Sequence, residues 1–237
     1  MGLSPCEMEK NKVKNKSIKV FTPNATSQLV VEETIRLIKK KVDVLDLGCG
    51  DGYIGLNIFK KKKSKIKSFS FSDLSQKATR KCAINAKKAG LKVVIKNGSM
   101  FDPWTNKKFD FIVESVSAIS EPVAYWSPWY NKHITCKAGQ DGTKLVNDIL
   151  KKGKKFLKKG GKIVFPIVSL SNKDKIIKVA KKNYKTVKLL SSKSWPLPKV
   201  LYKYEKQLEK LKKKKLIDYK KKFGIILYSS YVFVAIK

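Results

Sequence analysis

The sequence has 237 residues, and 54 lysines and arginines against 18 acids give it a formal net charge of +36. That length suffices for one large α/β domain with a buried core. The four cysteines form no Cys-x-x-Cys pair and there is one histidine, which excludes a structural zinc site, and no apolar run is long enough for a transmembrane helix. We therefore expect a cytoplasmic protein without a metal or a membrane partner, and we leave its oligomeric state open.

The excess of cations bears most directly on the partners of this protein. A field of this size attracts polyanions and makes their binding depend on salt. Nearly all the cations are lysines spread along the chain, which codon drift in an AT-rich genome also produces, although drift alone should raise the acids as well. Two readings stay open, a partner such as RNA, the ribosome or a translation protein, or compositional drift. Lysine runs such as 60–63 and 212–215 are typical of solvated helix ends.

The first forty residues divide into an arm and a helix. Residues 1–19 are polar, lysine-rich and aperiodic, which predicts a flexible basic arm in front of a single domain spanning 20–237. From 26 to 40 the apolar residues recur at helical spacing, so a helix should lead into the first strand.

Strands and helices alternate through most of the remaining chain. The predicted strands cover 42–47, 66–71, 93–96, 109–113, 162–168, 185–190 and 231–236, and the predicted helices cover 53–61, 76–89, 144–157, 173–182 and 199–215. Such alternation implies a mostly parallel sheet with helices on both faces. We predict an α/β, Rossmann-like, doubly wound fold with a seven-stranded sheet.

A glycine-rich turn follows the first predicted strand. Gly48, Gly50 and Gly52 stand at alternate positions, which departs from the Gly-x-Gly-x-x-Gly fingerprint of dinucleotide sites. Glycine serves where the backbone takes a positive φ or where a ligand approaches the main chain closely. The turn therefore indicates a loop for a nucleotide-type cofactor, and the alternative is a purely structural turn.

An acid follows the second predicted strand. Asp73 comes twenty-one residues after Gly52, where a nucleoside-binding α/β unit places the carboxylate that binds the ribose hydroxyls. Aspartate is also a preferred N-cap, and a helix is expected from 76 onward. Both roles are compatible with the sequence.

The segment Val-Leu-Asp-Leu-Gly-Cys-Gly-Asp-Gly at 44–52 resembles the first motif of class I S-adenosylmethionine-dependent methyltransferases. The flanking segments 23–32, 138–142 and 157–161 are similar to motifs of the release-factor glutamine methyltransferases and their small-domain relatives, so the resemblance covers about 20–170. It implies S-adenosylmethionine as the cofactor and a last strand that is antiparallel to the sheet.

The resemblance also implies which residues hold the cofactor. These are Ser27, Asp46, Gly48, Cys49, Gly50, Gly52, Asp73, Leu74, Ser99 and Met100. The relatives carry Gly-Asp after the third strand, where this chain has Gly98-Ser99, so the contact with the adenine amino group lacks a charge.

The chain departs from the family after the fourth strand. The family places Asn-Pro-Pro-Tyr there to hold a planar nitrogen, whereas this chain has Ser-Val-Ser-Ala at 115–118. Glu114 or Ser115 is the best-placed candidate for a catalytic group, because open α/β sheets bind ligands at the carboxyl ends of their strands. The alternatives are that Glu114 is a surface acid or a salt-bridge partner and that Ser115 is a turn residue.

The segment 125–133 is the most aromatic part of the chain. Tyr125, Trp126 and Trp129 are candidates for stacking a base or closing over a substrate, and His133 is a conceivable base. The alternative is a hydrophobic cap over the edge of the domain.

Three functions fit these observations. The first is methyl transfer to a macromolecule of the translation apparatus, at an RNA or protein nitrogen. The second is methyl transfer to a small molecule capped by the aromatic segment. The third is a non-catalytic protein with the cofactor fold that binds RNA or a partner protein.

Overall fold

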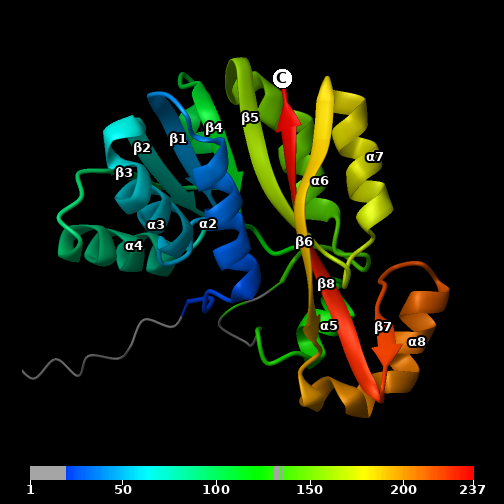
Figure 1. The fold of residues 1–237 in the computed structure, drawn as a ribbon. Helices are drawn as coiled ribbons and strands as arrows, with labels where there is room; N and C mark the ends of the chain where they lie inside the picture. Colours follow the sequence, from blue (N-terminus) through cyan, green and yellow to red (C-terminus); the bar gives the residue numbers. More distant parts are fainter. Residues whose placement is uncertain (1–19, 131–133, 135) are drawn as a thin grey trace, which may run out of the picture.

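A computed structural model describes residues 20–130, 134 and 136–237 (Figure 1). The basic arm expected at 1–19 lies outside these residues. Across the described part of the chain, no helix is long and apolar enough to cross a membrane.

Eight strands form one sheet, in the order β3-β2-β1-β4-β5-β8-β6 with β7 paired to β8. Their bounds are β1 (Val42–Leu47), β2 (Ile66–Asp73), β3 (Val94–Asn97), β4 (Phe109–Glu114), β5 (Leu157–Val168), β6 (Thr186–Pro196), β7 (Lys220–Lys222) and β8 (Ile225–Ile236). The first five strands pair in parallel, and β8 lies antiparallel between β5 and β6. The predicted fold class is confirmed, including the antiparallel last strand. The predicted number of strands was too low by one, because β7 is three lysines without apolar alternation.

The helices are α2 (Ala25–Leu37), α3 (Tyr53–Lys62), α4 (Gln76–Lys88), α5 (Glu121–Trp126), α6 (Lys144–Gly153), α7 (Lys173–Asn183) and α8 (Glu205–Lys213). The helix predicted over 199–215 is instead a 3-10 segment, η4 (Lys199–Tyr204), followed by α8. Helix α2 begins at a capping box, in which the Asn24 side chain accepts hydrogen bonds from the backbone N–H groups of Thr26 and Ser27.

Helices cover both faces of the sheet (Figure 1). On one face α2, α3 and α4 pack around Val44, Phe71 and Val113, and on the other α6 and α7 pack around Leu45 and Phe165. All six residues of β1 are buried, as expected for a central parallel strand. Because helices cover both faces of the sheet, polar groups of the strands are accessible mainly at the strand ends.

A third core lies beyond the sheet, where β6 and β8 continue past the ends of the parallel strands (Figure 1). The chain between them, residues 197–224, contains η4, α8 and β7, and we call it the β6–β8 extension. Leu201, Leu208 and Ile217 of the extension pack with Val123 and Ala124 of α5. The extension is therefore joined to the segment that follows β4.

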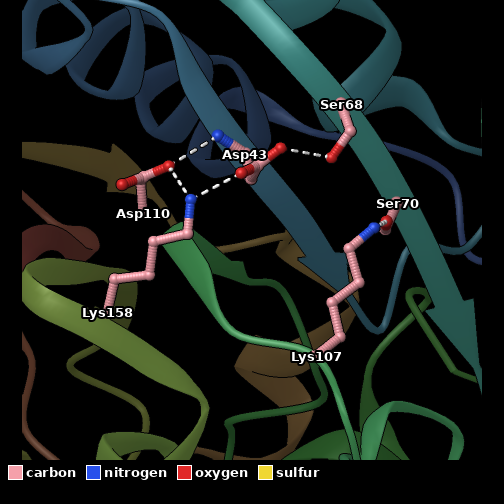
Figure 2. Close-up of polar contacts among 6 residues, drawn as sticks. All are labelled: Asp43, Ser68, Ser70, Lys107, Asp110 and Lys158. Carbon is pink, nitrogen blue, oxygen red and sulfur yellow. Dashed lines mark hydrogen bonds and ion pairs between the residues drawn. The ribbon is translucent and has the colours of Figure 1, made fainter.

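The amino ends of the strands carry a network of ion pairs (Figure 2). Lys158 Nζ lies 2.5 Å from Asp43 Oδ2 and 2.8 Å from Asp110 Oδ2. Asp43 also accepts a hydrogen bond from Ser68 Oγ at 2.6 Å, and Asp110 accepts one from the Asp43 N–H at 2.8 Å. Lys107 reaches Ser70 Oγ at 2.9 Å beside this network. The network connects β1, β2, β4 and β5 at the edge opposite the glycine-rich turn.

Candidate active site

A cavity of about 500 Å³ opens at the carboxyl ends of β1, β2 and β4. One half is lined by the glycine loop after β1, by the end of β2 and by the turn after β3. The other half is lined by the segment after β4, by the start of the described chain and by β5 and β8. Parallel sheets bind ligands at this edge because the loops diverge there. We call the two halves the loop half and the aromatic half.

The glycine loop adopts a conformation that side chains disfavour. Gly50 has φ +56° and Gly52 has φ +86°. A Cβ at Gly52 would lie 2.7 Å from Cys82 Sγ, whereas a Cβ at Gly50 would meet no described heavy atom within 4 Å. Gly52 is therefore required by packing, and Gly50 leaves open space against the cavity.

Asp46 lies behind this loop and does not line the cavity. Its side chain is fully buried, and Oδ2 accepts a hydrogen bond from the Gly55 N–H at 2.8 Å. Ser115 Oγ lies 3.4 Å from Oδ1 and donates to Gly48 O at 2.9 Å. Burial raises the pKa of Asp46 to about 7, against the hydrogen bonds from Gly55 and Ser115. Asp46 thus positions the loop from below.

Asp73 links the glycine loop to the end of β2. Its Oδ2 accepts a hydrogen bond from the Gly50 N–H at 3.0 Å, and its Oδ1 accepts one from the Ser75 N–H at 2.8 Å. The N-cap of α4 is Ser75, whose Oγ accepts from the Ala78 N–H at 3.3 Å. The interpretation of Asp73 as the helix cap was therefore wrong, and its carboxylate lines the cavity.

The remaining predicted cofactor residues also line the cavity, Asp46 and Gly52 excepted. They are Ser27, Gly48, Cys49, Gly50, Leu74, Ser99 and Met100. The Leu74 side chain is 73% exposed although it is apolar, and Met100 has a positive φ of 43°. An exposed leucine and a methionine at the rim of the loop half offer two apolar surfaces for a flat ring.

The two predicted catalytic residues of β4 are placed differently. Ser115 lines the cavity, but Glu114 is fully buried and does not. Glu114 Oε1 accepts a hydrogen bond from the Val116 N–H at 2.8 Å, and Oε2 has no hydrogen-bond partner among the described residues. Burial raises the pKa of Glu114 to about 8, so its carboxyl holds a proton at neutral pH. The alternative interpretation of Glu114 as a surface acid was wrong.

The aromatic half is built from distant parts of the sequence. Trp129 packs against Tyr228 with ring centroids 5.6 Å apart, and Tyr130 packs against Phe21 at the same distance. All four rings line the cavity. Burial raises the pKa of the Tyr130 hydroxyl well above its usual range, so this group stays protonated. Sequence reasoning missed Phe21 and Tyr228, because no local pattern connects them to the segment after β4.

The predicted substrate segment 125–133 is split by the structure. Residues 121–126 form α5, with Pro122 in its first turn, so Tyr125 faces solvent and is 87% exposed. Trp126 stacks on Tyr204 of η4 at 4.8 Å. Neither residue lines the cavity, and Trp129 alone of the three predicted substrate residues does. His133 lies outside the described residues.

Within the described ranges, no group of three or more His, Cys, Asp and Glu residues is arranged to hold a metal ion. The acids that line the cavity, Asp51 and Asp73, both belong to the loop half.

Comparisons with known proteins agree with this geometry. A model of the methyltransferase small domain matches residues 20–115. The chain is 27% identical over 162 residues to a bifunctional methyltransferase of Rickettsia typhi, covering 66% of this chain and 30% of that protein. It is 25% identical over 150 residues to a release factor glutamine methyltransferase of Geobacter sulfurreducens, covering 60% of this chain and 51% of that protein. The chain thus spans about a third to a half of the length of these curated relatives.

Solved structures share the fold at low sequence identity. A Thermus thermophilus 16S rRNA N2 G1207 methyltransferase, in complex with AdoMet and guanosine, has a TM-score of 0.55 and 13% identity, covering 92% of this chain and 45% of that one. A ribosomal protein L11 methylase from Lactobacillus delbrueckii has a TM-score of 0.53 and 16% identity, covering 88% and 76%. At these identities the likeness shows the fold alone.

Proposed function

We propose that this chain is a class I S-adenosylmethionine-dependent methyltransferase and that it transfers the methyl group to a nitrogen of RNA or protein in the translation apparatus. The observation that carries the proposal is the two-part cavity, in which a glycine loop with a carboxylate adjoins an aromatic half lined by four rings. Such a cavity can hold a nucleoside cofactor and a flat acceptor side by side.

The loop half fits S-adenosylmethionine. The open space at Gly50 lets a ligand approach the main chain, and the Asp73 carboxylate is placed to accept hydrogen bonds from ribose hydroxyls. Leu74 and Met100 would contact the adenine ring, and Ser99 would accept from its amino group. Asp46 would act indirectly, by holding the loop through Gly55 and Ser115.

The aromatic half would position the acceptor. S-adenosylmethionine bound in the loop half would supply an electrophilic methyl group on a sulfonium: a nucleophile would attack the methyl carbon in line as the carbon–sulfur bond breaks, and neutral S-adenosylhomocysteine would leave. The rings of Trp129, Tyr130 and Tyr228 exclude water and offer faces against which a planar group can stack. Among the described residues this half presents no carboxylate, so it suits a nitrogen that attacks with its own lone pair. Glu114 is too deeply buried to serve as its base.

Two observations support a substrate in the translation apparatus. The chain carries a net charge of +36, which favours polyanionic partners. The solved structures with this fold include methyltransferases named for 16S rRNA, for tRNA and for a ribosomal protein. We further propose that residues 20–237 act as one unit in the cytoplasm.

A small-molecule acceptor is the second candidate. It is favoured by the aromatic half itself, because four rings around one cavity also suit a free apolar or cationic compound.

The test is transfer of radiolabelled methyl from S-adenosylmethionine into a cell extract that is then separated into RNA, protein and small-molecule fractions. We expect label in RNA or protein, reduced about 10- to 100-fold by Asp73→Asn, because charge-assisted hydrogen bonds to the ribose are lost. Asp102→Asn is the matched control, since Asp102 is exposed and does not line the cavity. Label confined to small molecules would support the second candidate. Absence of label despite cofactor binding would leave a non-catalytic protein.

A further inference from the structure

The β6–β8 extension carries a high positive charge. Residues 197–224 contain eleven lysines and three acids, a net charge of +8 over 28 residues, against +28 over the other 209. Residues 60–88 reach a similar density, with a net charge of +10 over 29 residues, so charge alone does not distinguish the extension.

The three acids of the extension form ion pairs with two of its lysines. Lys221 pairs with Glu205 and Glu209, and Lys212 pairs with Asp218 at 3.0 Å. The other nine lysines are exposed and form no ion pair with any described residue; they are Lys199, Lys203, Lys206, Lys210, Lys213, Lys214, Lys215, Lys220 and Lys222. Exposed cations without a paired acid attract anionic partners.

The aromatic residue Phe223 follows three lysines in the sequence, and its side chain is exposed to solvent. Phe223, at the turn between β7 and β8, is 93% exposed and has a φ of +48°. Neither burial nor backbone preference explains a phenylalanine there, since a side chain of this size normally gains stability by burial and disfavours a positive φ. Lys222 Nζ lies 5.9 Å from its ring centroid. Lysines around an exposed ring are the combination that binds single-stranded nucleic acid, through phosphates and a stacked base.

The extension also connects to the proposed active site. Tyr228, four residues beyond it on β8, packs with the core of the extension and lines the aromatic half of the cavity. Figure 1 shows the extension on the side of the sheet where the parallel strands end. The aromatic half of the cavity is lined by Lys137 and, among the described residues, by no acid that would repel a phosphate.

We propose that the β6–β8 extension binds single-stranded RNA, with phosphates on its exposed lysines and a base stacked on Phe223, and so delivers a nucleotide to the aromatic half. This inference rests on the proposed function and selects RNA from its two macromolecular substrates. An anionic membrane is disfavoured because the large exposed apolar residues of the extension are Phe223 and the half-exposed Val200, joined by Ile225 at the start of β8, which is little apolar surface to insert into lipid.

The test measures binding of a fluorescein-labelled 20-nucleotide single-stranded RNA of mixed sequence to the full chain, by fluorescence anisotropy at several salt concentrations. Lys206, Lys210 and Lys213 are exposed and lie on one face of α8. Changing all three to glutamine should weaken binding about 10-fold or more and lower the slope of log affinity against log salt by about 2. Lys60, Lys61 and Lys63, equally exposed at the end of α3, give the matched triple control, which should change affinity less than about 2-fold.

Phe223→Ala should weaken RNA binding about 5- to 100-fold, while Phe223→Trp should preserve it. Equal affinity of all variants for the RNA would overturn the inference. So would Phe223-dependent binding to phosphatidylserine vesicles with unchanged RNA affinity, which would assign the surface to a membrane. Titration of S-adenosylmethionine into the wild type and each variant separates the two proposals. The variants should bind the cofactor as tightly as the wild type does. If the wild type itself does not bind the cofactor, the proposed function is refuted and not the RNA inference.

Discussion

Asp43 and Asp46 lie three residues apart on β1, and their surroundings shift their pKa values in opposite directions. Asp43, near the amino end of the strand, is held by Lys158 and Ser68. Burial alone would raise its pKa, but the hydrogen bonds from Lys158 and Ser68 bring the pKa below its usual value. Asp46, near the carboxyl end, is fully buried without a cation, and burial raises its pKa to about 7.

The difference separates the amino edge of the sheet, which ion pairs hold together, from the carboxyl edge, where the cavity opens. At the amino edge both described carboxylates of the network pair with Lys158, which connects β1, β4 and β5, and the hydrogen bond from Ser68 adds β2 (Figure 2). At the carboxyl edge Asp46 and Glu114 are buried without a cation, directly beneath the cavity. Groups that cost stability in this way tend to be kept where a ligand site needs them.

Asp46→Ala should have the largest effect. It leaves the Gly55 N–H without its acceptor and opens a hole beneath the glycine loop, so we expect a loss of about 3 kcal/mol in the free energy of unfolding and at least a 10-fold weaker affinity for S-adenosylmethionine. Urea denaturation and calorimetric titration measure the two effects. Asp46→Asn keeps an acceptor for Gly55 and should retain most of both, so equal damage from Asn and Ala would contradict this account.

The stability of the protein should fall with rising pH, because the two buried carboxyls at the carboxyl edge, Glu114 and Asp46, have raised pKa values. Between about 4.5 and 8, Glu114 ionises in the unfolded chain but not in the folded one, so the free energy of unfolding should fall as the pH rises through this window. Asp46 acts in the same direction up to about pH 7. At about 1.4 kcal/mol for each pKa unit, each of the two groups contributes on the order of 4 kcal/mol across its window.

Glu114→Gln isolates the contribution of one group. The variant should be less stable than the wild type at pH 5, because a buried amide lacks partners, and more stable at pH 9, where the wild type must ionise a buried carboxyl. Thermal unfolding from pH 5 to 9 should therefore give two curves that cross. Parallel curves would show that Glu114 does not carry the shift.

Lys158→Met removes both ion pairs at the amino edge. It leaves Asp43 and Asp110 close together without a cation, and we expect a loss of about 2 kcal/mol, limited by the 37% exposure of the Lys158 side chain. Cofactor affinity should not change, because this edge is remote from the cavity. A loss of cofactor affinity per folded molecule would contradict the separation of the two edges.

Gly50→Ala should have the smallest effect on stability, about 1 kcal/mol, since a positive φ is strained for alanine. Gly90 is the matched control, with φ +65° and equally open space around its Cβ position, but at the end of α4 and outside the cavity lining. Both alanine variants should unfold alike, and only Gly50→Ala should weaken S-adenosylmethionine binding. Equal cofactor affinities would place the ligand away from Gly50.

The sequence predicted what is local and periodic. The alternation of strands and helices, the glycine loop and the position of Asp73 at the end of β2 all follow from spacing over a few residues. Burial of Glu114 could not be predicted, because the cover over the end of β4 comes from distant segments. For the same reason the aromatic half was only partly anticipated: Trp129 is local to the predicted segment, whereas Tyr228 lies a hundred residues further along the chain.

The pairing of β8 between β5 and β6 has a consequence for the order of folding. β6 pairs with β8 and with no other described strand, so it stays an unpaired edge until β8 has been synthesised and inserted. Contacts between segments so far apart in sequence form late and slowly. The glycine loop and the first five strands can form beforehand, but Tyr228 reaches the cavity only with β8. During synthesis the loop half of the cavity would therefore be assembled before the aromatic half, which is completed only when β8 has been inserted.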